Sequence, residues 1–105
     1  MEMTGKQRAY LRAMANTIDA KYQIGKNGIE DNLLKTLSDA LEANEIIKVH
    51  VLESSMLDTR EACTIICEEI NAEPVQCIGS KFVIYRESKN KKKIELPKVP
   101  KKNKK

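Results

Sequence analysis

A chain of 105 residues is long enough for one domain and too short for two separate cores. It contains no apolar run near the roughly 18 residues that a membrane-spanning helix needs, and its first residues lack the apolar segment of a secretory signal. Three cysteines in such a chain indicate free thiols, so we expect a cytoplasmic protein.

The net charge of +4 is divided unevenly along the chain. Residues 1–88 hold ten Lys/Arg and fourteen Asp/Glu, a net charge of −4, whereas residues 89–105 hold nine Lys and one acid, a net charge of +8. We interpret 1–88 as the folded domain and 89–105 as a disordered basic tail. Such a tail is typical of proteins that bind a polyanion, although it can also serve only for solubility.

The first helix is predicted over residues 5–17, where Leu11, Met14 and Ile18 recur at helical spacing. Thr4, with Gln7 three residues later, is a capping-box start. A short strand follows over 21–24. The second helix, over about 30–43, ends at Asn44, a residue suited to a left-handed stop; its apolar stripe is Leu33, Leu34, Leu37, Ala40 and Leu41.

The next strand is predicted over 46–52, because its side chains alternate. Ile47, Val49 and Val51 share one face, and Lys48 and His50 share the other, which we expect to be partly open.

A third helix begins at Asp58, with Glu61 as its capping-box partner, and ends near Ala72. Two last strands flank a two-residue turn at Gly79 and Ser80, with glycine where a type II′ turn requires it. In that register one face carries Val75, Cys77, Phe82 and Ile84, and the other carries Gln76, Ile78, Lys81, Val83 and Tyr85.

The element order is therefore α-β-α-β-α-β-β, an α/β sandwich. Helices join the strands outside the hairpin, so the four-stranded sheet should be mixed.

The loop between the first strand and the second helix reads Gly25-Lys26-Asn27-Gly28. Glycines let another backbone approach closely, and a helix start offers free N–H groups to phosphate. The spacing matches neither a dinucleotide fingerprint nor a Walker motif, so we expect no cofactor. A plain tight turn is the alternative, which Glu30 and Asp31 favour because carboxylates repel phosphate.

Several segments together resemble a known family: TGKQRAYLRAMA, QIGKNGIEDNLL, LEANEIIKVHVL, IGSKFVIYRES and KKIELPK. Over residues 3–97 the chain is similar to the bacterial YhbY-type single-domain form of the CRM (chloroplast RNA splicing and ribosome maturation) domain. The resemblance implies the element order above, a fold similar to the C-terminal domain of translation initiation factor 3, and RNA binding. It also implies an association with maturing large ribosomal subunits.

The family's functional positions fall on three segments of this sequence. Its GxxG is Gly25, Lys26, Asn27 and Gly28. Its basic first-helix motif is Lys6, Gln7, Arg8 and Arg12, and its aromatic-basic strand end is Tyr85 and Arg86. Because helix 1 carries no acid between residues 3 and 18, we expect Arg8 and Arg12 to lie near the GKNG loop in one positive patch.

No residue set indicates catalysis, a metal or a small-molecule substrate. Cys63, Cys67 and Cys77 are interpreted as buried thiols because they lack the paired spacing of zinc ligands, and His50 has no visible catalytic partner. The predicted function is RNA binding in large-subunit assembly, by a protein that is not an enzyme. A protein-interaction module with a solubilising tail, and an RNA-modifying enzyme, are the alternatives.

Overall fold

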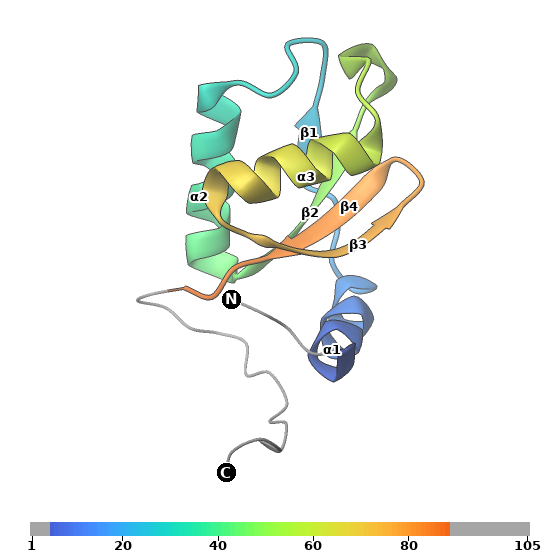
Figure 1. Ribbon diagram of the computed structural model, residues 1–105, viewed down its shortest axis with the longest axis vertical. Coiled ribbons are helices and arrows are strands. Elements are labelled where there is room, and N and C mark those ends of the chain that lie inside the picture. Colours follow the sequence, from blue (N-terminus) through green and yellow to red (C-terminus); the bar gives the residue numbers. More distant parts are fainter. Residues whose placement is uncertain (1–4, 89–105) are drawn as a thin grey trace.

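The computed structural model describes residues 5–88 of the chain. Its elements, in order, are α1 (Gly5–Ala15), β1 (Tyr22–Ile24), α2 (Asp31–Asn44), β2 (Ile46–Val51), the 3₁₀ turn η1 (Glu53–Ser55), α3 (Thr59–Ile70), β3 (Glu73–Ile78) and β4 (Lys81–Tyr85) (Figure 1). The predicted order of helices and strands is confirmed, with η1 as an addition. The Thr4 cap and the predicted basic tail, 89–105, lie outside the described residues.

The four strands form one mixed sheet in the order β1-β2-β4-β3. β1 pairs parallel with β2, while β4 pairs antiparallel with both β2 and β3. The parallel pair is possible because α2 carries the chain back from the end of β1 to the start of β2. The same geometry places the loop after β1 next to the end of β2.

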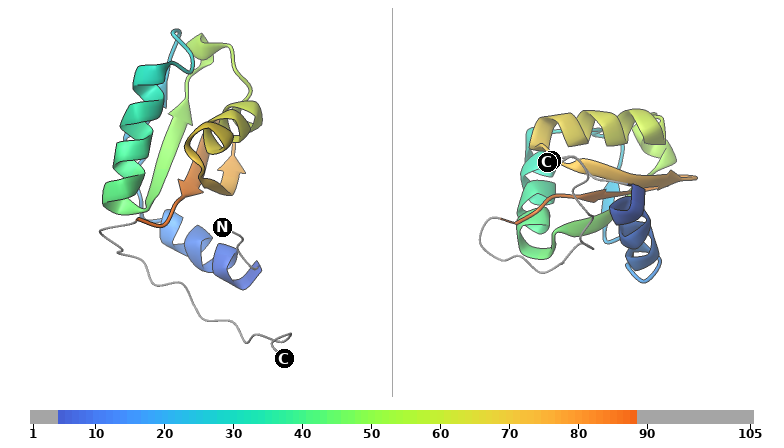
Figure 2. Two further views of the ribbon diagram at one scale, coloured as in Figure 1. Left: turned by 60° about the vertical axis from the view of Figure 1, so that its left-hand side comes forward. Right: turned by 60° about the horizontal axis from the view of Figure 1, so that its bottom comes forward.

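Helices cover both sides of this sheet, which we call the α1 side and the α2/α3 side (Figure 2). On the α2/α3 side the main core joins the two helices to the inward residues of β2 and β4, including Val49, Phe82 and Ile84. On the α1 side a smaller cluster joins Leu11 and Ala15 to four strand residues, namely Ile46, Val75, Val83 and Tyr85. α1 is therefore held by few buried side chains.

Val75 lies on the opposite side of the sheet from the one that simple alternation predicts. The register between β3 and β4 shifts between Pro74 and Gln76, where one extra β3 residue, Val75, stands against the consecutive β4 residues Ile84 and Val83. This bulge moves Val75 to the α1 side, whereas Cys77 stays paired with Phe82 as predicted. Proline at the bulge has no N–H to donate, which is consistent with the break in the ladder.

The helix ends show which capping residues were predicted correctly from the sequence and which were not. Asp58 caps α3 as predicted, since its carboxylate accepts hydrogen bonds from the backbone N–H groups of Arg60 and Glu61. α2 instead continues through Asn44, and the left-handed residue is Glu45, with φ of 69°. Glu45 is completely buried, and its carboxylate accepts a 2.7 Å hydrogen bond from the Ser88 N–H, so a tertiary contact determines this stop.

None of the helices within residues 5–88 is long and apolar enough to cross a membrane.

Candidate nucleic-acid interface

The GKNG loop is a tight, outward-facing turn. The Gly28 N–H donates a 2.9 Å hydrogen bond to the Gly25 carbonyl, and Gly28 has φ of +69° with open space where a Cβ would stand. Lys26 and Asn27, at the tip, are both exposed. The Cα of Gly25 faces Leu52 and Ser54, whose side chains would be in van der Waals contact with a Cβ at that position. The turn thus presents two polar side chains at its tip, while its first glycine lies against the segment after β2.

A shallow hollow of about 290 Å³ lies beside this turn. The loop lines it together with Gln23 from β1 and the first residues of α2, including Asn32 and Thr36. Glu30 is the N-cap of α2, but its side chain makes no capping hydrogen bond. Its carboxylate therefore does not satisfy the backbone N–H groups at the start of the helix. Asp31 occupies the first turn, where its charge opposes an incoming anion.

The predicted basic residues of α1 differ in their surroundings. Lys6 and Arg12 are exposed, and Arg8 is half-buried. Within the described residues, the Arg8 Nε is buried and has no hydrogen-bond partner. Gln7 is half-buried and engaged by another group. α1 therefore offers two freely exposed cations and a third that is partly covered.

The structure does not bring α1 and the GKNG loop together. The loop follows β1, which pairs with the end of β2 at Val51, whereas α1 packs over the start of β2 at Ile46. These two ends of β2 are about 16 Å apart, from five residue steps of a strand. Figures 1 and 2 show α1 and the loop at opposite ends of the sheet. The expectation of one compact patch is wrong, because charge along a helix does not specify where the helix docks.

Tyr85 and Arg86, also predicted as RNA contacts, have structural partners here. Tyr85 is 1% exposed beneath α1, and burial, followed by Glu45 and Glu87, raises its pKa to about 12. The Arg86 guanidinium donates 2.8 Å hydrogen bonds to the carbonyls of Ile70 and Ser38, which links the end of α3 to the middle of α2. Both side chains thus serve the fold.

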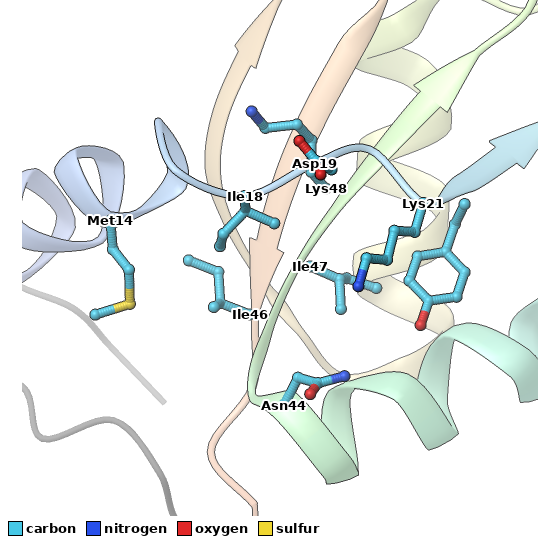
Figure 3. Close-up of a pocket in the computed structure, with 9 residues that line it drawn as sticks. Met14, Ile18, Asp19, Lys21, Asn44, Ile46, Ile47 and Lys48 are labelled. Atoms are coloured by element: carbon cyan, nitrogen blue, oxygen red, sulfur yellow. The ribbon is translucent and has the colours of Figure 1, made fainter.

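Other cations on the α1 side lie between these two ends. Lys21 and Lys48 line a pocket of about 340 Å³ between the chain leaving α1 and the start of β2 (Figure 3). Asp19 lies beside them, and Ile18 and Ile46 form part of the apolar wall. Lys81, at the start of β4, is exposed. Lys48 and Lys81 were not among the residues predicted to bind RNA, although their place on the polar face of the strands is a signal in the sequence that could have included them.

The charges separate between the two sides of the sheet. α2 and α3 together carry six acids and two bases within their bounds, whereas α1 carries three bases and no acid. Lys35 on α2 is paired with Asp39 at 3.4 Å. The α1 side is thus the one whose electrostatics suit a polyanion.

The three thiols lie between α3 and β3 as free cysteines. Cys63 and Cys67 are buried, and the hydrogen bond that the Cys67 thiol donates to Cys63, together with burial, raises the pKa of Cys67. Burial also raises the pKa of the Cys77 thiol. Across residues 5–88, no three His, Cys, Asp or Glu side chains are grouped so as to hold a metal ion.

Comparison with known proteins places this geometry in a family. The family model described as the CRS1/YhbY (CRM) domain matches residues 3–86. The chain is 41% identical over 95 residues to YqeI of Bacillus subtilis, named a probable RNA-binding protein, with 90% of this chain and 99% of that one covered. It is 32% identical over 95 residues to a Haemophilus influenzae protein named RNA-binding protein, covering 90% of this chain and 95% of that one.

A solved structure agrees with these relatives. The solution structure of a Staphylococcus aureus protein, described as an RNA-binding candidate, superposes with a TM-score of 0.72 at 47% sequence identity. The match covers 91% of this chain and all of that one. The resemblance noted from the sequence motifs is confirmed, and this chain belongs to the CRS1/YhbY (CRM) domain family.

Proposed function

We propose that this protein binds RNA and that the GKNG loop holds part of the RNA backbone. The observation that carries the proposal is the turn itself, with exposed Lys26 and Asn27 beside a polar hollow at the start of α2. Backbone N–H groups, an amide and an ammonium suit phosphate oxygens and the 2′-OH. The names of the relatives support the same ligand class.

The finer proposal is that the ligand is ribosomal RNA and that the protein acts in assembly of the large ribosomal subunit, in the cytoplasm. Its support is the family association that the sequence motifs imply. Lys6, Arg8 and Arg12 would add charge from α1, and the Lys-rich residues 89–105 would add non-specific attraction. Recognition rather than catalysis is the role, and the relatives named above are described as RNA-binding proteins, not as enzymes.

Replacement of Lys26 by alanine in the full chain tests the loop. On single-stranded RNA, Lys26→Ala should weaken binding and reduce the magnitude of the salt slope by about 0.7, the value for one lost phosphate contact. Lys35→Ala is the matched control, because Lys35 is an exposed lysine already paired with Asp39 on the acidic side. Fluorescence anisotropy over a range of salt concentrations gives both quantities.

Gly28→Asn tests whether the RNA backbone closely approaches the same turn. Among residues other than glycine, asparagine adopts positive φ most readily, so this change adds a side chain with less strain than most replacements. Reduced affinity with only a small fall in melting temperature is expected. The proposal for the loop fails if both loop variants bind RNA as well as Lys35→Ala does. The proposal of RNA binding fails altogether if the unmodified chain shows no salt-dependent association with RNA.

A further inference from the structure

One row of side chains crosses the whole sheet on the α1 side, and α1 does not cover it. Its members come from neighbouring strands in direct register: Gln23 pairs with His50, His50 with Lys81, and Lys81 with Ile78. We call these four residues the open row. None of them belongs to the cluster that packs beneath α1.

The open row is accessible to a ligand. Gln23 and Lys81 are exposed, His50 is half-buried, and Ile78 is 66% exposed, one of the most exposed large apolar side chains in residues 5–88. Three strand spacings of about 4.8 Å give the row a length of about 14 Å. The row combines one exposed apolar side chain with polar ones, which suits a partner that has both polar edges and apolar faces.

The open row is continuous with the GKNG loop. Gln23 belongs to the row and also lines the hollow beside Gly25, Lys26 and Asn27. Further along the row, the Val51 N–H donates a 2.7 Å hydrogen bond to the Ser80 carbonyl. This bond connects the end of β2 to the turn between β3 and β4. The loop and the row are therefore neighbours through Gln23, at the end of the sheet where β1 and β2 end.

We propose that the open row is a platform for the bases of single-stranded RNA whose backbone is held at the GKNG loop. This inference rests on the proposed function and extends its site across the sheet. The His50 imidazole and the Ile78 side chain would contact base faces, the Gln23 amide would pair with base edges, and Lys81 would neutralise a phosphate. A four-stranded sheet of this width accommodates about two or three bases.

Electrostatics favours RNA at this row. Lys48, two residues before His50 on β2, shares the α1 side, and no ion pair engages Lys48 or Lys81 within the part of the chain described here. Glu73 shares that side but pairs with Tyr85 at the far end of β4. The acids of α2 and α3 lie on the other side of the sheet.

Two pairs of matched variants of the full chain test the platform. Ile78→Ser is compared with Ile65→Ser, because Ile65 is also an exposed isoleucine, 41% exposed, but on α3. Lys81→Gln is compared with Lys35→Gln. The probe is a single-stranded RNA of about 12 nucleotides, measured by fluorescence anisotropy with melting temperatures for each variant.

Ile78→Ser should weaken binding about fivefold, the lower end of the range for a base stacked on an aromatic ring, because an aliphatic side chain makes a smaller contact. Ile65→Ser should leave binding unchanged. Lys81→Gln should reduce the magnitude of the salt slope, and Lys35→Gln should not. In NMR titrations, backbone signals of the open row should move with RNA, and those of α3 should not.

The platform is refuted if the unmodified chain binds RNA and depends on Lys26, yet Ile78→Ser and Lys81→Gln behave like their controls. That result would leave the loop as the site. Absence of RNA binding by the unmodified chain would refute the proposed function itself, so the two failures are distinguishable.

Discussion

At the scale of single residues, Arg86 shows how a basic residue near a predicted interface can belong to the core instead. Its guanidinium donates to the Ile70 carbonyl, which lies in the last turn of α3 and has no intrahelical partner, and to the Ser38 carbonyl in the middle of α2. Glu42 lies 4.0 Å from the same guanidinium. The side chain therefore joins α2, α3 and the end of β4.

Replacing Arg86 should consequently affect stability before it affects binding. Arg86→Ala removes two charge-assisted hydrogen bonds, and we expect a loss of about 2–4 kcal/mol in the free energy of unfolding, measured by urea denaturation. Arg86→Lys should restore little, because one ammonium cannot reproduce the fork. An unchanged urea midpoint together with lost RNA affinity would instead assign Arg86 to the interface.

The raised pKa of Tyr85 predicts that the stability of the fold depends on pH in the alkaline range. Its pKa is about 12 in the fold and about 10 when unfolded, so the unfolded chain loses the phenolic proton first. The stability from this group is thus complete below pH 10 and is lost as the pH rises toward 12. Thermal melting of the protein and of Tyr85→Phe over this range checks it. The phenylalanine variant should show a shallower decline, and parallel curves would contradict the prediction.

At the scale of elements, α1 is attached to the rest of the fold through a small cluster of its own. Leu11 and Ala15 are its fully buried residues, with Met14 and Ile18 packed against the cluster. α2 and α3 share the larger core on the other side. α1 is therefore the element whose docking depends most on one side chain.

Leu11→Ala should reveal that dependence. Removing a buried leucine costs about 2–5 kcal/mol from lost transfer energy and the cavity left behind. Because Leu11 contacts the cluster with Val83 and Tyr85, hydrogen exchange should accelerate in α1 more than in α3. Met14→Ala, at a half-buried position of the same helix, should cost less. Equal acceleration in α1 and α3 would show that the two sides of the sheet unfold together.

At the scale of the whole molecule, the sheet separates a basic side from an acidic one. The GKNG loop lies at one end and the α1 cations at the other, with Lys48 and Lys81 on the sheet face between them. A ligand that contacts both ends must therefore extend along the sheet rather than occupy a compact patch.

This arrangement predicts that the length of the RNA decides which cations matter. With RNA of about four nucleotides, Lys26→Ala should weaken binding and Arg12→Ala should not, because so short a strand reaches one end only. With about sixteen nucleotides both variants should bind more weakly, and their losses should add, since the two residues share no partner. Titrations with both lengths test this, and dependence on Arg12 at the shorter length would contradict it.

Five features could be predicted from the amino-acid sequence alone: the element order, the mixed sheet, the Asp58 cap, the Gly79 turn and the GKNG loop. These follow from periodicity, capping chemistry and glycine, which act within a few residues. Three features become visible only in the folded chain: α1 docks far from the loop, a bulge moves Val75 to the α1 side, and Tyr85 and Arg86 face inward. Docking depends on shape and burial between segments distant in the chain, and a charge pattern along one helix does not contain that information. The open row is the clearest case, because its four residues are brought side by side only when the strands pair.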